Sequence, residues 1–193
     1  GHTFPGAVVP HGMIQPSPDT RIDGWDACSG YYYEDSTING FSHTHVSGTG
    51  CCDYGDVLLM PTVGEQRYQT TDPQSQQLAY SSAFSHENET AEPGYYSVFL
   101  DTYQVKAEIS ATKRGAIHRY TFPESSEAGF ILDLDYSLQR QTNSDMGIEV
   151  ISDTEICGHK KTTYWAFDQY INFYAKFSKP FSYTLVTDSI TMD

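Results

Sequence analysis

The fold is indicated most directly by the stretch Val105-Lys106-Ala107-Glu108-Ile109-Ser110-Ala111-Thr112, in which apolar and polar residues alternate. The stretch that follows it, Gly115-Ala116-Ile117-His118-Arg119-Tyr120-Thr121-Phe122, alternates in the same way. Successive side chains of a β-strand point to opposite faces of the sheet. A period of two therefore predicts two strands of a sheet that has one buried face and one face in water.

Short strand-like runs separated by turn signals recur on both sides of these two stretches. No window shows a sustained helical stripe with a period of about 3.6 residues. The pattern predicts an all-β fold in which two antiparallel sheets pack as a sandwich. At 193 residues the chain fits a single domain, residues 1–193. The predicted runs cover residues 57–60, 77–85, 94–100, 105–112, 115–122, 129–135, 146–152, 163–175 and 181–186.

Residues 1–56 differ from the rest of the chain. They are rich in Gly, Pro, Ser and Asp, and their apolar runs, such as residues 6–10 and 39–41, are too short for helices. This composition predicts long ordered loops joined by short strands. Long loops that are not disordered are usually functional, so we expect the binding surface to lie in this part of the chain.

The composition excludes several classes of protein. The formal net charge of −14 argues against binding to nucleic acid or to anionic membranes, because their phosphates would be repelled. No apolar stretch approaches the length of a membrane span. Aromatic residues make up 14% of the chain, with 15 Tyr and 10 Phe, and this favours strands and sugar-binding surfaces.

The four cysteines are Cys28, Cys51, Cys52 and Cys157. Adjacent cysteines rarely bridge each other, so the pair Cys51–Cys52 allows at most one disulfide, with Cys28 or Cys157 as the distant partner. Four free or buried thiols are the equally open alternative. Cysteine usage therefore leaves the cellular compartment undecided.

A cluster of polar and aromatic residues surrounds Trp25, in the sequence Asp23-Gly24-Trp25-Asp26-Ala27-Cys28. One interpretation is a stacking surface for a sugar ring, with carboxylates such as that of Asp26 accepting hydrogen bonds from hydroxyl groups. The alternative is a Trp side chain that packs beneath its own loop. The residues themselves leave both interpretations open.

A second cluster contains His43, His45, Cys51, Cys52 and Asp53. The two histidines would share a face of an extended segment and could begin a zinc site, with one of the three later residues as a further ligand. Hydrogen-bonded loop histidines are the commoner outcome, and we favour that interpretation.

Two acidic pairs invite a catalytic or metal-binding interpretation. Glu87 and Glu89 could act as an acid and base, but a solvated hairpin loop is the simpler expectation. Asp133 and Asp135 could bind calcium, although the other spaced oxygen ligands of an EF-hand are absent.

Several longer segments resemble the amino-terminal domain of glycoside hydrolase family 92. They are ordered along nearly the whole chain, which makes the resemblance specific. The segments are Thr3-Phe4-Pro5-Gly6-Ala7-Val8-Val9-Pro10, residues 12–13 and 15–20, Gly40-Phe41-Ser42-His43-Thr44-His45-Val46-Ser47-Gly48-Thr49-Gly50, Asp53-Tyr54-Gly55-Asp56, and residues 84–89, 93–96, 118–123 and 177–181.

The resemblance implies part of a calcium-dependent, exo-acting and inverting α-mannosidase that trims N-glycans or mannan. It implies a β-sandwich of the supersandwich type joined to a carboxy-terminal helical toroid, with the active site between the two. The acid, the base and the calcium ligands are expected on the toroid. We therefore expect no catalytic residue and no metal ligand in this chain, which would form one wall of the mannoside pocket.

The same resemblance implies roles for individual residues. Trp25 matches a Trp that contacts the leaving sugar in enzymes of the family that cleave α-1,2 linkages. Asp26 lies beside it, and His43, His45, Cys51, Cys52 and Asp53 are expected to line or support the pocket. One departure is His11, where the resemblance leads us to expect an aromatic residue such as Phe.

Two features of the chain bear on its context. It begins without a Met or a signal peptide and ends without a terminal helix, which predicts a fragment of a longer enzyme. The family resemblance implies that this enzyme is periplasmic or extracellular and bacterial. A free-standing carbohydrate-binding β-sandwich is the alternative function. A small zinc hydrolase built on His43 and His45 is the least favoured.

Overall fold

The computed structural model describes residues 2–48, 50–68 and 75–186, and β-strands form most of its regular structure. Two four-stranded sheets, one three-stranded sheet and one two-stranded sheet are present in this part of the chain, and every strand pair is antiparallel. Three short 3-10 helices interrupt the loops of the described residues: η1 (Trp25–Ala27), η2 (His86–Asn88) and η3 (Leu138–Arg140).

The first sheet has the order β1-β3-β4-β10, and the second has the order β6-β7-β8-β9. Strands β11, β12 and β13 form the third sheet, and β2 pairs with β5. The bounds are β1 (Ser17–Asp19), β2 (Thr37–Ile38), β3 (Gly40–Ser42), β4 (Leu58–Val63), β5 (Ser82–Ala83), β6 (Glu89–Glu92), β7 (Tyr95–Leu100), β8 (Val105–Ala111), β9 (Ala116–Thr121), β10 (Ala128–Asp133), β11 (Thr142–Val150), β12 (Glu155–Thr163) and β13 (Gln169–Lys176).

Local sequence explains the meander of the second sheet. Strands β6 and β7 are joined by Pro93 and Gly94, and Gly94 has a φ of 78°. Proline fixes the first central position of such a turn, and glycine tolerates the positive φ required at the second. In β8 the side chains of Val105, Ala107 and Ile109 are fully buried, as the alternating pattern predicts.

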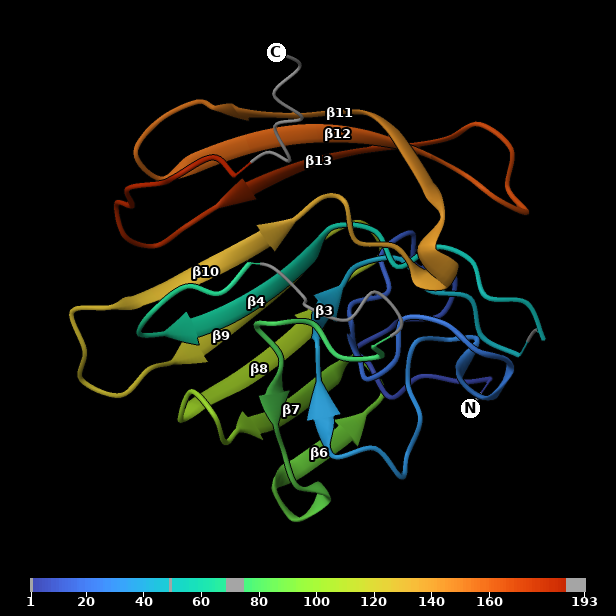
Figure 1. Cartoon of the computed structure of the whole chain (residues 1–193), viewed down its shortest axis with the longest axis horizontal. Helices are drawn as coiled ribbons and strands as arrows, with labels where there is room; N and C mark the ends of the chain where they lie inside the picture. The colour runs from blue at the N-terminus through green and yellow to red at the C-terminus, as the bar shows by residue number, and fades with distance from the viewer. Residues whose placement is uncertain (1, 49, 69–74, 187–193) are drawn as a thin grey trace.

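The main core lies where the first two sheets face each other. It contains Phe41 of β3, Leu58 and Met60 of β4, Val98 of β7 and Ile109 of β8, all of them almost entirely buried. Their burial removes apolar surface from water, which is the main favourable contribution to folding. Figure 1 shows these strands as the centre and lower part of the molecule, with the N-terminal loops packed at one end.

The sheet β11-β12-β13 forms a further layer beside β10 (Figure 1). The Phe130 ring of β10 lies 5.8 Å from the ring of Phe177, which follows β13. Lys160 of β12 is fully buried and reaches back to the N-terminal loops. This outer sheet is therefore attached to the rest of the fold at two places, near the middle of β12 and just after β13.

The all-β sandwich predicted from the sequence is confirmed, and the run of short strands and ordered loops over residues 1–56 is present. Strands β7, β8, β9 and β10 lie where expected. Three details are wrong. Residues 181–186 form no strand, residues 77–85 contain only the two-residue β5, and residues 163–175 include a turn before β13 begins at Gln169. None of the helices in the described residues has the length and apolar character needed to cross a membrane.

Candidate functional site

Trp25 begins η1 and is the most prominent side chain of the N-terminal loops. Its side chain remains 70% exposed although its ring is held in place. The ring of His2 packs edge-on against it at 5.5 Å, and a side chain at Gly50 would come within 2.6 Å of the indole. Gly24, just before it, has a φ of 108°, a conformation that favours glycine. The local sequence therefore presents an ordered indole to solvent, and the neighbouring Asp26 is also exposed.

Two buried thiols hold the backbone of this loop through hydrogen bonds. The Cys28 thiol donates to the carbonyl of Trp25 at 3.2 Å, and the Cys52 thiol donates to the carbonyl of Gly24 at 3.5 Å. Burial and the adjacent Cys28 thiol raise the pKa of Cys52 to about 12. None of the four cysteines forms a disulfide; Cys51 is partly exposed and Cys157 lies on β12. Of the two bridging partners considered from sequence, only Cys28 lies beside Cys52.

His45 points into the interior rather than toward the loop surface. Its Nδ1 lies 2.7 Å from the carbonyl of Gln15, and its Nε2 lies 2.8 Å from Oδ1 of Asp19. The other oxygen of Asp19 accepts the hydroxyl of Ser42 at 2.5 Å. The side chains of His45 and Asp19 are completely buried. His45 therefore serves to hold the loop onto β1.

His43 belongs to a chain of hydrogen bonds that leads away from Trp25. Its Nδ1 lies 2.6 Å from the carbonyl of Val57, so Nδ1–H donates there and Nε2 is left to accept. Nε2 of His118 lies 3.1 Å away and donates to it, while Nδ1 of His118 accepts the hydroxyl of Tyr120 at 2.8 Å. When both imidazoles are neutral, each ring N–H has an acceptor and each unprotonated ring nitrogen has a donor. Burial lowers the pKa of His43 and lowers that of His118 further.

Asp53 also has a structural partner. Its Oδ1 accepts the backbone N–H of Tyr54 at 2.9 Å, and its Oδ2 accepts the backbone N–H of Ala166 at 3.0 Å. Ala166 lies in the connection between β12 and β13. The carboxylate of Asp53 thus fixes the tip of this hairpin to the loop that carries Cys51 and Cys52.

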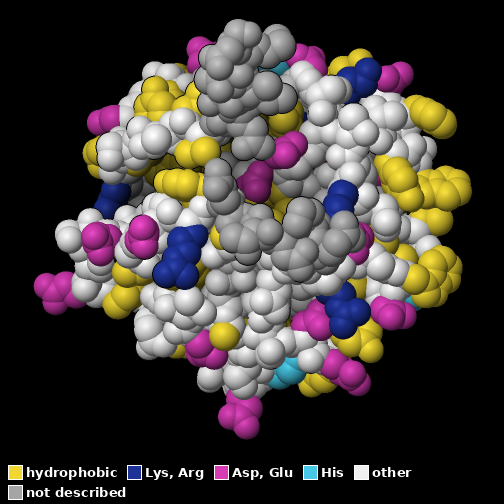
Figure 2. Space-filling view, in the orientation of Figure 1, with side chains coloured by type: hydrophobic (Ala, Val, Ile, Leu, Met, Phe, Trp, Pro, Cys, Tyr) yellow, Lys and Arg dark blue, Asp and Glu magenta, His cyan; other side chains and the backbone are white. Residues whose placement is uncertain are grey.

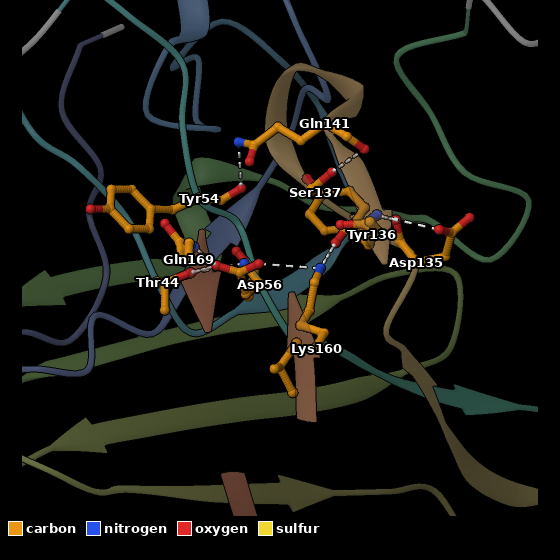
Figure 3. A network of polar contacts seen from close by, with 12 residues as sticks. Thr44, Tyr54, Asp56, Asp135, Tyr136, Ser137, Gln141, Lys160 and Gln169 are labelled. Carbon is orange, nitrogen blue, oxygen red and sulfur yellow. Dashed lines mark hydrogen bonds and ion pairs between the residues drawn. The ribbon is translucent and has the colours of Figure 1, made fainter. Parts of the chain in front are cut away.

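A buried network around Asp56 makes the second connection to the hairpin (Figure 3). Its Oδ2 accepts Thr44 and Gln169, each at 2.7 Å, and its Oδ1 lies 3.2 Å from Nζ of Lys160. Lys160 also donates to the carbonyl of Tyr136 at 2.7 Å. Burial lowers the pKa of Lys160, and the charge of Asp56 opposes this effect. The segment from Gly50 to Asp56 therefore joins the Trp25 loop to the outer sheet.

The sequence predicts that Glu87 and Glu89 lie in a solvated hairpin loop. Glu87 is exposed as expected, whereas the side chain of Glu89 is buried. The Glu89 side chain is only 7% exposed, and its carboxylate accepts the hydroxyls of Tyr31 and Tyr96 and contacts Nδ1 of His86 at 2.6 Å. The expectation was wrong because strand β7 and Tyr31, far apart in sequence, converge on this carboxylate. Burial raises the pKa of Tyr31 and Tyr96, so both phenols stay protonated donors.

No three His, Cys, Asp or Glu side chains come together in an arrangement that could hold a metal ion among residues 2–48, 50–68 and 75–186. His43 and His45 make separate sets of hydrogen bonds, so the described residues offer no zinc site around them. Asp133 and Asp135 likewise belong to no cluster of three such side chains among these residues.

The residues predicted from the sequence thus fall into two groups. Trp25, Asp26 and the partly exposed Cys51 lie toward the loop surface, whereas His45, Cys52 and Asp53 are buried and His43 is partly buried behind it. Sequence reasoning missed Asp19 and His118, the partners of the two histidines. It also missed Trp165, which is 66% exposed in the connection between β12 and β13. The presence of only two Trp residues could have drawn attention to it.

Comparison with known proteins identifies the family. The model of the glycosyl hydrolase family 92 N-terminal domain matches residues 1–192. The chain belongs to glycosyl hydrolase family 92. It is an amino-terminal domain of that family, as the sequence segments predicted.

Two solved structures resemble this family 92 domain. The family 92 α-mannosidase BT3965 from Bacteroides thetaiotaomicron, solved in complex with mannoimidazole, is 40% identical with a TM-score of 0.85; the match covers 93% of this chain and 24% of that one. The inverting mannosidase BT2199 from the same organism is 30% identical with a TM-score of 0.66, over 82% and 19%. The chain therefore spans about a quarter or less of the length of these enzymes.

A further relative is described as an uncharacterized secreted glycosidase from Arthroderma benhamiae. It is 32% identical over 130 residues, which cover 65% of this chain and 16% of the relative.

Proposed function

We propose that this family 92 domain is the non-catalytic part of an α-mannosidase and forms one wall of its mannoside-binding pocket. The observation that carries the proposal is Trp25, an indole 70% exposed to solvent yet held by His2 and Gly50. The face of an aromatic ring is apolar and its surroundings here are polar, as a sugar ring requires. Asp26, exposed beside it, can accept hydrogen bonds from sugar hydroxyls.

The surface around Trp25 fits one wall of a sugar-binding pocket better than a complete pocket. The described residues include two surface clefts of about 270 and 320 Å³, and Trp25 lines neither of them. An inverting glycosidase needs two carboxyl groups roughly 6.5–9.5 Å apart with a water molecule between them. We place that pair, which family resemblance assigns to a helical toroid, in a part of the enzyme beyond this chain.

We propose that the calcium ion implied by the family resemblance also binds in the part of the enzyme beyond this chain. The placement is compatible with the described part of this chain, which brings no three acidic, His or Cys side chains together. Calcium binding by the complete enzyme remains a prediction, and no step of the proposal depends on a metal in this domain.

For the substrate we propose α-mannosides of N-glycans or mannan, with α-1,2 linkages as the preferred class. The similarity to two bacterial mannosidases supports the sugar, and the net charge of −14 is compatible with a neutral substrate. The relative described as secreted supports an extracellular or periplasmic location.

The test is Trp25→Ala in the complete enzyme. We expect kcat/KM for α-1,2-mannobiose to fall by about two- to tenfold, the effect of one aromatic contact. An aryl α-mannoside, which has no leaving sugar, should lose less, and Trp25→Phe should restore much of the loss. Equal kcat/KM values for Trp25→Ala and wild type on mannobiose would contradict the assignment of Trp25, and absence of mannoside hydrolysis by the wild type would contradict the function.

A further inference from the structure

The connection between β12 and β13 exposes an unusual amount of aromatic surface. Trp165 is 66% exposed, Phe167 is 79% exposed and Tyr164 is 41% exposed. The rings of Tyr164 and Trp165 pack edge to face with centroids 6.5 Å apart. We call residues 164–168 the aromatic tip. Exposed aromatic surface gathered in one place is typical of a contact site.

The aromatic tip is held in a fixed position. The backbone N–H of Ala166 donates to Asp53, and Tyr164 N–H donates to the carbonyl of Ala166 at 3.3 Å. Lys161 pairs with Asp168 at 2.6 Å across the base of the tip. The side chain of Gln169, directly after the tip, donates to the buried Asp56. Its aromatic rings are therefore presented from an anchored turn.

The aromatic tip lies close to Trp25. The indole of Trp25 sits over Gly50, and Asp53 holds Ala166, so only the segment Gly50–Asp53 separates the two attachments. Three residues of extended chain span at most about 10 Å. Figure 1 shows the β12–β13 connection at the same end of the molecule as the N-terminal loops, to the right. Figure 2 shows hydrophobic side chains along that edge.

The chemistry of the aromatic tip fits a saccharide. Indole and phenol rings offer apolar faces to sugar C–H groups, and the Tyr hydroxyl offers a polar handle. The side chain of Asp168 is 72% exposed beside them and can accept hydrogen bonds from hydroxyl groups. The anchor of the tip at Asp53 lies only three residues along the chain from Gly50, against which Trp25 packs. A longer chain of sugars leaving the Trp25 contact would meet the tip.

We propose that the aromatic tip, through Trp165, is a second contact surface for mannosides longer than a disaccharide. The inference rests on the proposed function, because it extends the sugar surface that begins at Trp25. It assigns to Trp165 a role in binding the distal sugars and none in the chemical step.

The experiment compares Trp165→Ala, Trp25→Ala and wild type in the complete enzyme on α-1,2-mannobiose and on a linear α-1,2-mannotetraose. For Trp165→Ala we expect kcat/KM on the tetraose to fall by about two- to tenfold, as for one aromatic contact, with the value on the disaccharide unchanged. Trp165→Phe should recover part of the loss. Tyr174→Ala is the matched control, because Tyr174 is an aromatic side chain of β13 with 59% exposure, beyond the tip.

Three results would overturn the inference. One is an unchanged kcat/KM on the tetraose when Trp25→Ala still lowers activity, which leaves the proposed function standing. Another is an equal loss of kcat/KM on both substrates together with a lower thermal midpoint, which would assign the tip to docking against another part of the protein. A wild-type enzyme that cleaves neither mannoside would remove the inference along with the proposed function.

Discussion

His43 and His118 are joined by a hydrogen bond between their Nε2 atoms. The other hydrogen bonds of the two rings determine which of these atoms carries the proton. Val57 supplies a carbonyl that can only accept, and Tyr120 supplies a hydroxyl that donates. A proton added to His43 would occupy Nε2 and face the Nε2–H of His118 at 3.1 Å. The folded state therefore favours the neutral form of both rings, in agreement with the lowered pKa of each.

This pair predicts a loss of stability in mild acid. The folded pKa of His118 lies well below the ordinary 6.5, so below about pH 6.5 the unfolded chain binds a proton that the folded chain does not. Stability is fully present above pH 6.5 and falls as the pH drops from 6.5 toward the folded pKa. We expect the thermal midpoint of wild type to fall between pH 7.5 and pH 5.5, and His118→Gln to lose less over the same interval.

The control for this prediction is His159→Gln. The side chain of His159 is 50% exposed, and this variant should keep the pH dependence of wild type. If His118→Gln and wild type show the same change in midpoint between pH 7.5 and pH 5.5, the neutral pair does not contribute to the acid sensitivity.

At the scale of elements, one attachment of the outer hairpin β12–β13 is a buried ion pair. Lys160 and Asp56 are both without exposed surface, and Asp56 also fixes Thr44 and Gln169. Removing one partner of a buried pair leaves an uncompensated charge and costs about 3–5 kcal/mol, whereas removing both is often close to neutral. Lys160→Met should therefore lower the free energy of unfolding by about that amount, and Lys160→Met with Asp56→Asn should recover most of it.

Chemical denaturation followed by tryptophan fluorescence measures this prediction. Lys106→Met is the matched control, since Lys106 is 53% exposed and its ion pair with Glu108 is 3.6 Å long. Exposed ion pairs contribute at most about 1 kcal/mol. A loss for Lys160→Met no larger than that for Lys106→Met would show that the pair does not hold the hairpin.

The same hairpin shows where sequence patterns stop being informative about strands. Strands β8 and β9 were predictable because one face of each packs on the core, so apolar and polar residues alternate. In β12 the most buried long side chain is Lys160, and Gly158 lies against Phe173 of the next strand. A buried charge and a glycine break the alternation, and β12 was missed for this reason. Residues 181–186 carry the aromatic and β-branched composition of a strand but have no strand partner.

At the scale of the molecule, the sequence located the loop surface but could not assign each polar residue to it. Trp25 and Asp26 are exposed, and their contact with a sugar stays a prediction. His45 and Asp53 are equally polar in the sequence, yet Asp19 and Ala166, distant along the chain, draw them inward. Such partners follow from tertiary packing, which a single sequence does not reveal. Glu89 is the same case, because Tyr31 and Tyr96 bury it.

The proposed location of the calcium site outside this domain predicts that calcium removal affects the activity of the enzyme and leaves the folding of the sandwich unchanged. Because we propose that the calcium site lies outside this chain, removal of calcium should abolish mannoside hydrolysis by the complete enzyme while the sandwich stays folded. Cys52 reports on the folded sandwich, because its burial and its raised pKa both make the thiol slow to alkylate near pH 8. We expect a chelator to remove activity without changing the rate of Cys52 alkylation, measured by mass spectrometry. Restoration of activity by added calcium is the control. Fast alkylation of Cys52 in chelator would mean that calcium also stabilises the sandwich, and full activity in chelator would contradict a calcium-dependent enzyme.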